Sequence, residues 1–284
     1  MRKFRLGKLP ARKGATKFKF DQFFSIENLP TPPATFGTYK ELDDWPIFAN
    51  DTYGDCVFAG AGHEHISWNY EGQKTAQFTT NAILKAYSDV TGFNVNDPTT
   101  DLGTDMEAAA SYRRKTGIKD TVGKYHKVDA YVELKLGSFE QLKVAMYLFG
   151  AVGIGFLFPT SAWDQFEFGV PWDVPTTGYP IDGGHYVAGI GINEKGNIVC
   201  VTWGKEHEMT PAFYEKYADE VLAYIELDRL KGTLSPEGFD SAKLEEFLLQ
   251  LKKNDGYFAK LEAGALSWWE KLLAWLKSLF SWLN

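Results

Sequence analysis

Cys56, at the start of a predicted helix, is the residue whose type and position best suit nucleophilic chemistry. It lies in NDTYGDCVFAGAGHEHISW, residues 50–68, which passes from polar turn residues into a helix. Gly54 and Asp55 can form the turn and the N-cap, and the small residues that follow would let another element approach closely. Partial positive charge at a helix N-terminus favours the thiolate, the nucleophilic form of cysteine. A buried structural cysteine is the alternative interpretation of this segment alone.

His185 could supply the general base that such a thiol needs. It follows two glycines in DGGHYVAGIGI, residues 182–192, and opens an apolar run typical of a buried strand. A neutral imidazole can take the thiol proton, and the thiolate can then attack a carbonyl carbon. A histidine about 130 residues after the cysteine matches the spacing of the papain and cathepsin peptidases.

Other segments resemble the papain-like cysteine peptidases in the same order. Asn50 precedes Cys56 by six residues, where the family carries the glutamine whose amide helps to form the oxyanion hole. VTWG, residues 201–204, resembles the family's asparagine-serine-tryptophan-glycine segment. The longer similar segments are DLGTDMEAAASYRRKTGI, residues 101–118, and SFEQLKVAMYLFGAVGIGF, residues 138–156. Order and spacing match from about residue 40 to about residue 227.

The resemblance implies a role for each matching residue. Asn50 would stabilise the oxyanion together with the backbone N–H of Cys56, although asparagine is one methylene shorter than glutamine. Gly103 falls where the family's backbone pairs with the substrate. Trp203 matches the tryptophan that shields the histidine's partner from water, and we place it with Gly103 at the substrate-binding side of the site.

The third catalytic residue departs from the family pattern. The match of VTWG puts Val201 where the family has an amide that orients the histidine. Thr202 is the nearest polar candidate and is assigned to the site, although strand alternation is expected to send its side chain to the opposite face. The sequence therefore leaves open a Cys–His dyad, a looser triad or an inactive relic.

Composition and cysteine count limit the classes of function. Apolar residues at 44% and aromatic residues at 15% argue against disorder, and a formal charge of −7 argues against a dedicated nucleic-acid binder. A nucleophilic Cys56 cannot also be bridged to Cys200, the second of the two cysteines, so we expect no disulfide and a cytoplasmic or virion-associated protein. No N-terminal apolar run has signal-peptide length. His63 and His65 lie two apart on a helix and do not share a face, so no metal or cofactor is expected.

The predicted organisation has an arm, a catalytic domain and an appendage. Residues 1–35 form a basic, Pro-rich arm, residues 36–228 a papain-like hydrolase domain, and residues 229–284 a helical appendage. Helices come first and strands second in the central part. This order predicts an α+β chain with a two-lobed papain-like fold, in which a helical lobe carries the nucleophile and an antiparallel sheet or barrel lobe carries the histidine.

The arm and the terminal helix suggest partners. The first twenty residues hold eight Lys or Arg and no acidic residue, which suits an acidic partner, a nucleic acid or anionic lipid; a solvated terminus is the alternative. Papain-like zymogens cover their active-site groove with N-terminal propeptides. Those propeptides are longer than this arm and are helical, so the resemblance gives only weak support for a covering role here. Leu266 to Leu283 form a wide apolar face with four tryptophans, which suits a membrane surface or a groove of this or another protein. Charges along that helix argue against a membrane span.

Together these features predict a cysteine hydrolase that cleaves peptide or amide bonds of a peptide or protein substrate by Cys–His covalent catalysis. The GDC, GGH and VTWG segments resemble short stand-alone members encoded by phages and prophages, which implies a virion or lysis-related role. One alternative is an inactive structural or virion protein that keeps the fold and is anchored by the terminal helix. Another is a membrane-perturbing protein in which that helix is the active part.

Overall fold

The computed structural model describes residues 4–24, 26, 29–226 and 229. Contacts divide the chain after Arg229 into two units, and the first of these contains the whole predicted catalytic domain. The predicted appendage, including Leu266 to Leu283, lies outside the described residues, so its fold and its proposed partners stay predictions. Among the described residues, no helix is long and apolar enough to cross a membrane.

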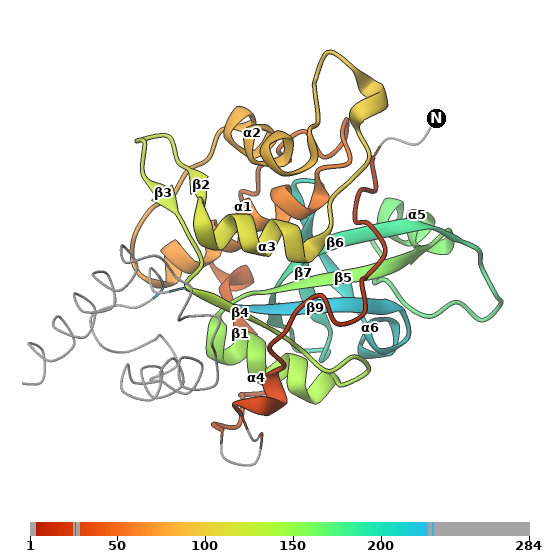
Figure 1. Cartoon of the computed structure of the whole chain (residues 1–284). Helices are drawn as coiled ribbons and strands as arrows, with labels where there is room; N and C mark the ends of the chain where they lie inside the picture. The colour runs from red at the N-terminus through yellow and green to blue at the C-terminus, as the bar shows by residue number, and fades with distance from the viewer. Residues whose placement is uncertain (1–3, 25, 27–28, 227–228, 230–284) are drawn as a thin grey trace, which may run out of the picture. The chain divides into compact units, whose positions relative to one another are not determined.

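Three helices form the first half of the catalytic domain (Figure 1). They are α1 (Cys56–Glu71), α2 (Thr80–Thr91) and α3 (Met106–Lys115). The Thr79 side chain caps α2 by accepting a hydrogen bond from Ala82 N–H, and Asp105 caps α3 by accepting one from Ala108 N–H. These caps satisfy donors that a helix start leaves free, which explains why the helices begin there.

The second half is a seven-stranded antiparallel sheet. Its order is β4-β9-β5-β6-β7-β8, and the short β1 also pairs with β6. The strands are β1 (Phe36–Gly37), β4 (Ala130–Glu133), β5 (Val152–Pro159), β6 (Ile181–Ile192), β7 (Ile198–Thr202), β8 (Lys205–Met209) and β9 (Ala218–Ile225). The predicted α+β class, with helices first and an antiparallel sheet second, is confirmed.

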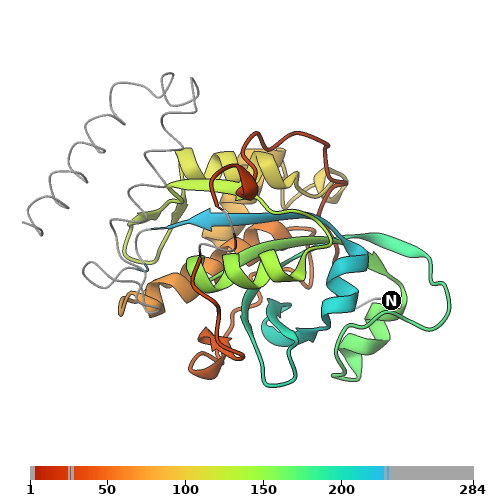
Figure 2. The ribbon, with the colours of Figure 1, turned by 90° about the horizontal axis from the view of Figure 1, so that it is seen from below.

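Smaller elements complete this half of the domain. The helices are α4 (Phe139–Phe149), α5 (Ser161–Glu167) and α6 (Pro211–Tyr217), and β2 (Ile118–Lys119) pairs with β3 (Tyr125–His126) away from the main sheet. Short 3-10 turns are η1 (Phe20–Gln22), η3 (Thr38–Lys40) and η4 (Pro98–Thr100). Figure 2 shows α4 and α6 together on the side of the sheet that faces the viewer from below.

Helix α1 packs directly on β6, and a small residue permits the approach. The Tyr186 ring of β6 lies against Gly60, where a Cβ would come within 2.5 Å of the ring carbon Cε1. Tyr186 also donates a hydrogen bond of 2.6 Å to the buried Glu64 of α1, whose carboxylate pairs with Arg113 of α3. The predicted small-residue surface is therefore the contact that sets α1 against the strand of His185.

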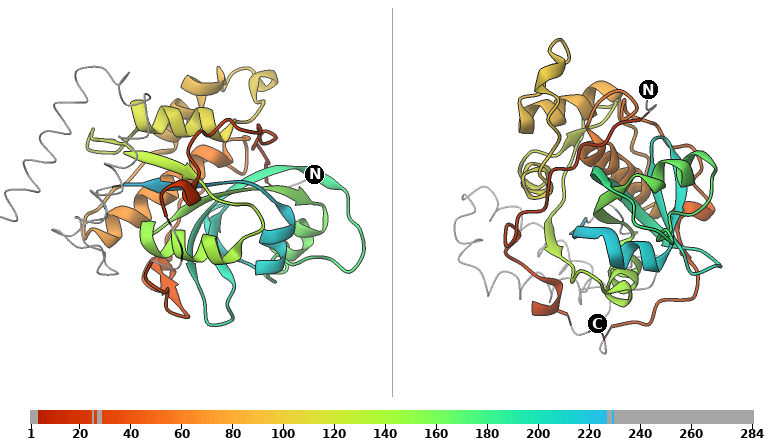
Figure 3. Two further views of the ribbon diagram at one scale, coloured as in Figure 1. Left: turned by 60° about the horizontal axis from the view of Figure 1, so that its bottom comes forward. Right: turned by 90° about the vertical axis from the view of Figure 1, so that its right-hand side faces the viewer.

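The N-terminal arm is extended, as predicted, and it is attached to the domain along its length. Figures 1 and 3 show it in dark red, passing from the helical half across the sheet. Backbone hydrogen bonds join Leu9 to Thr104 and Lys8 to Gly184. The side chain of Phe20 is fully buried. A solvated, unattached terminus therefore does not describe residues 4–24.

Candidate active site

Cys56 is the first residue of α1, as predicted, and is 1% exposed. The loop before it includes Phe48 and Ala49, both with left-handed backbone at φ 56° and 67°. Such strained non-glycine residues persist only where the surrounding structure holds them, and they cluster at functional sites. Asp55 occupies the N-cap position, but its side chain makes no capping hydrogen bond, which corrects the expected capping role.

His185 lies on β6 and is fully buried. Its Nε2 atom lies 2.7 Å from the Thr202 hydroxyl, whereas Nδ1 has no hydrogen-bond partner among the described residues. When Nε2 carries the proton and donates a hydrogen bond to the Thr202 hydroxyl oxygen, Nδ1 is the basic nitrogen. The structure therefore presents one fixed and one available ring nitrogen, as a general base requires.

Thr202 is brought to His185, against the expectation that its side chain would face away. Val201 pairs with Ala188 of β6, and both belong to the core cluster that contains α1 residues. Because side chains alternate along a strand, Thr202 at the end of β7 lies on the other face, and there it meets His185. The error lay in placing Val201, rather than Thr202, on the face of the histidine.

Trp203 covers the imidazole of His185. The two rings stack with centroids 4.4 Å apart and an interplanar angle of 18°. Trp203 takes this position through a left-handed φ of 46° in the turn before Gly204, which joins Thr202 to its β8 partner Lys205. The indole N–H donates to the Arg5 carbonyl of the arm at 3.2 Å. The shielding role implied by the resemblance fits this geometry, while contact with a substrate stays a prediction.

Burial keeps both reacting groups neutral in this conformation. It lowers the pKa of His185 to about 3. It also raises the pKa of Cys56 to about 12, although hydrogen bonds from the backbone of Tyr186 and Gly7 act in the opposite direction. The helix N-terminus predicts a thiol pKa below the usual value, so this expectation fails for the arm-covered site. Removal of water around the sulfur outweighs the helix dipole.

Asn50 is close to Cys56 in sequence, but its amide is used inside the loop. Nδ2 donates to the Tyr53 carbonyl and to Asp55 Oδ1, each at 3.1 Å. An amide nitrogen has two hydrogens, so both are engaged in this conformation. Burial raises the pKa of Asp55 well above its usual value, and the Asn50 contact opposes that rise. The oxyanion role of Asn50 stays a prediction that requires this loop to rearrange.

The arm runs through the site where the resemblance places a substrate backbone. Thr104 N–H donates to the Gly7 carbonyl at 2.7 Å, and the Thr104 carbonyl accepts from Leu9 N–H at 2.9 Å. Gly103 is the residue assigned to substrate pairing. Its N–H does not bond to the arm and instead donates to the Tyr87 hydroxyl at 3.0 Å. The structure thus places Gly103 beside the paired position, and its contact with substrate stays a prediction.

Sequence reasoning missed the arm's passage across the nucleophile. A Cβ on Gly7 would lie 1.8 Å from the Gly54 carbonyl oxygen, so only glycine fits over the loop before Cys56. Lys8 follows, with a fully buried side chain paired to Asp219. A glycine flanked by apolar and basic residues in a basic arm was the only signal, and such a pattern is too common to predict burial.

No group of three or more His, Cys, Asp or Glu side chains that could hold a metal ion occurs in the part of the chain that the structure describes. Cys56 and Cys200 are both free and buried.

No protein-family model matches the sequence, and no curated protein matches it. Solved structures do. The chain is similar to xylellain, a cysteine protease from Xylella fastidiosa, with a TM-score of 0.57, 13% identity, and coverage of 80% of this chain and 97% of that one. It is similar to procathepsin B S9 from Trypanosoma congolense, with a TM-score of 0.54, 12% identity, and coverage of 77% and 86%.

A third neighbour is the proform of the ragweed pollen allergen Amb a 11, a cysteine protease, with a TM-score of 0.54 and 17% identity over 76% of this chain and 72% of that one. The chain has the papain-like fold. This agrees with the fold that the resemblance implies, while the roles of Cys56 and His185 stay predictions.

Proposed function

We propose that this chain is a papain-like cysteine peptidase that hydrolyses peptide or amide bonds through a thioester on Cys56. The observation that carries the proposal is the arrangement of His185, whose Nε2 is held by Thr202 while Nδ1 has no described hydrogen-bond partner. The ring of Tyr186, the residue after His185, packs on Gly60 of α1, so β6 lies against the helix that begins at Cys56.

The proposed reaction follows from these positions. His185 Nδ1 takes the thiol proton, and the Cys56 thiolate attacks the substrate carbonyl carbon. The backbone N–H of Cys56, at the helix start, donates to the oxyanion. The imidazolium then protonates the leaving amine, which departs as the thioester forms. Water, deprotonated by the same nitrogen, hydrolyses the thioester and restores the thiol.

The described conformation is a covered one. The arm places Gly7 against Gly54, two residues before the nucleophile, and fills backbone positions at Thr104 and Gly184. A substrate cannot occupy these positions while the arm does, so catalysis requires residues 5–9 to leave. Two of the neighbours are described as proforms by their own names, which supports the same arrangement here.

The biological setting belongs to the proposal as well. Similarity of the GDC, GGH and VTWG segments to phage and prophage proteins supports a virion-associated or cytoplasmic peptidase. The basic arm supports an acidic partner only if it leaves the groove, because in the described conformation Lys8 and Arg12 are paired within the chain. An inactive structural protein is the competing function, and labelling separates the two.

Iodoacetamide labelling of the full chain tests the function. Both cysteines are buried, but only Cys56 is uncovered when the arm leaves the groove, so we expect it to react at least about tenfold faster than Cys200, and His185→Ala to remove that advantage. In Gly7→Ala, whose added methyl group should lift the arm, hydrolysis of a pool of internally quenched peptides should be lost when Cys56→Ala is added and kept with the matched control Cys200→Ala. Equal labelling of both cysteines, unaffected by His185→Ala and without hydrolysis, would favour the structural role.

A further inference from the structure

The Lys8 side chain of the arm lies in a pocket beside the nucleophile. It is fully buried, and its aliphatic part crosses Gly155 of β5, where a Cβ would come within 2.3 Å of Lys8 Cε. The same missing Cβ would lie 2.4 Å from Met106 Sδ of α3. The pocket is therefore shaped for a long unbranched side chain, with Met106 as one wall and the bare backbone of Gly155 as its floor.

The far end of this pocket is acidic. Lys8 Nζ lies 2.9 Å from Asp219 Oδ2 and 3.0 Å from the carbonyl oxygen of Leu9. The other carboxylate oxygen, Asp219 Oδ1, is buried and has no hydrogen-bond partner among the described residues. Burial raises the pKa of the adjacent Glu220 to about 7, and the positive charge of Lys8 opposes that rise. A second carboxyl group therefore interacts electrostatically with the same lysine.

The position of the pocket relates it to the proposed reaction. Lys8 N–H donates to the carbonyl of Gly184, the residue before His185, at 3.1 Å. Gly7, the residue before Lys8, lies against Gly54, two residues before Cys56. The side chain in the pocket therefore belongs to the residue next to the one that covers the loop before the nucleophile. A pocket at this distance can select the side chain of a bound peptide.

We propose that Met106, Gly155 and Asp219 form a specificity pocket for a basic side chain, so that the substrates are peptides with lysine or arginine next to the residue held at Cys56. Lys8 of the arm occupies this pocket as an internal substitute for the substrate. The inference rests on the proposed peptidase function. Arginine suits the pocket because its planar fork can donate to both oxygens of Asp219, including the unpartnered Oδ1.

Electrophilic dipeptides test the pocket in the full-length Lys8→Ala chain. The probes are acetyl-X-glycyl acyloxymethyl ketones in which X is lysine, arginine, norleucine or glutamate, and mass spectrometry follows the modification of Cys56. Norleucine keeps the four-carbon chain of lysine and lacks its charged amino group. We expect lysine and arginine to react at least about tenfold faster than norleucine, because a hydrogen-bonded charge pair discriminates by that much. Any part of the arm that still covers the groove slows all probes alike, so the ratio reports the pocket.

A second substitution assigns the preference to its carboxylate. In Lys8→Ala with Asp219→Asn, the ratio of lysine to norleucine should fall close to one, and no buried lysine is left without a partner. Lys8→Ala with Asp89→Asn is the matched control, since Asp89 pairs with Lys85 within α2, and it should keep the ratio. A ratio near one in Lys8→Ala itself would overturn the pocket, while His185-dependent labelling of Cys56 would leave the peptidase proposal standing.

Rescue of the Lys8→Ala variant by a small amine tests the pocket separately from catalysis. A small amine has no chain direction, so the result does not depend on which way a peptide would run through the groove. Millimolar n-butylammonium should raise the melting temperature of Lys8→Ala above any effect on the wild-type chain, whereas n-butanol at the same concentration should not. The rise should disappear when Asp219→Asn is added. No rise in Lys8→Ala, or an equal rise with Asp219→Asn, would contradict the pocket even if Cys56 proved unreactive.

Discussion

Thr202 holds the imidazole of His185 through a hydroxyl, at 2.7 Å, whereas the resemblance to papain-like peptidases implies an amide for this contact. A hydroxyl oxygen accepts a hydrogen bond from Nε2–H as an amide oxygen does, and it adds no charge. The types and spacing of neighbouring residues were enough to predict that Cys56 begins a helix and that His185 lies on a buried strand. Thr202 was assigned to the site with the wrong orientation, because a five-residue strand that is buried throughout shows no alternation from which its faces could be told apart.

Replacing the hydroxyl tests the orienting role of Thr202. Thr202→Val keeps the shape and removes the acceptor, so we expect the second-order rate of Cys56 alkylation to fall about tenfold to a hundredfold. Thr202→Ser should restore most of the rate, which a packing role for the methyl group would not allow. A rate unchanged in Thr202→Val would mean that stacking on Trp203 alone holds the ring.

At the scale of elements, the contact of α1 with β6 aligns the nucleophile with its base. The run of small residues after Cys56 predicted a close approach, and Gly60 against Tyr186 is that approach. Strand β8 and helix α5 were not predicted. Strand β8 depends on a turn with Trp203 at positive φ, a conformation that the sequence disfavours and that tertiary packing imposes. Helix α5 lies within an aromatic stretch whose regular pattern is too short to show helical periodicity.

Enlarging Gly60 should weaken this contact. In Gly60→Ala the new methyl group would overlap the Tyr186 ring, and overpacking of this kind costs about 1–3 kcal/mol of unfolding free energy. Urea unfolding followed by tryptophan fluorescence measures the change. Gly178→Ala is the control, because a Cβ there meets nothing within 4 Å. Equal stability of the two variants would show that α1 and β6 separate easily.

Displacing the arm should change the protonation of the nucleophile. Gly7→Ala places a methyl group against the Gly54 carbonyl and should lift the arm from the groove. Burial is the main cause that raises the pKa of Cys56 to about 12, so hydration should lower it. Since the thiolate is the reactive form, alkylation at pH 7 should become faster and its midpoint should move to lower pH. Gly178→Ala should leave the profile of the wild type, and the same profile in Gly7→Ala would contradict the covering role.

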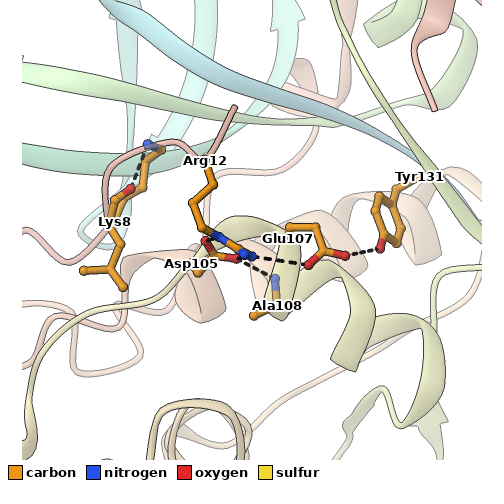
Figure 4. A network of polar contacts seen from close by, with 7 residues as sticks. Lys8, Arg12, Asp105, Glu107, Ala108 and Tyr131 are labelled. Carbon is orange, nitrogen blue, oxygen red and sulfur yellow. Dashed lines mark hydrogen bonds and ion pairs between the residues drawn. The ribbon is translucent and has the colours of Figure 1, made fainter. Parts of the chain in front are cut away.

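At the scale of the whole chain, the arm joins the two halves of the domain through three cationic residues. Arg12 donates to Asp105 of α3, with Nη2 2.7 Å from Oδ1, and Figure 4 shows it lying between Asp105 and Glu107. Lys19 pairs with Glu133 of β4, and Lys8 pairs with Asp219 of β9. The charge of the arm was evident from the sequence. Its partners within the chain were not, because each pair joins residues distant in sequence and no local pattern identifies them.

The three ion pairs differ in solvent exposure, and this difference predicts which of them contributes most to keeping the arm on the domain. Arg12 and Lys19 are 59% and 42% exposed, whereas the Lys8 side chain is fully buried. Burial alone would raise the pKa of Asp105, but the Arg12 contact holds it below the usual value, so this pair persists to acidic pH. Exposed pairs contribute little and are screened by salt, while a buried pair is not. Lys8 should therefore account for most of the arm's hold on the groove.

Alkylation of Cys56 at pH 7 compares the three pairs directly. Arg12→Met, Lys19→Met or 1 M sodium chloride should change the wild-type rate by less than about threefold, because each weakens only an exposed pair. Lys8→Met replaces the aliphatic part of the side chain but leaves the Asp219 carboxylate without its cation, so the arm should open more often and the rate should rise about tenfold or more. High salt as effective as Lys8→Met would instead mean that the surface charges hold the arm, and that the buried lysine only fills space.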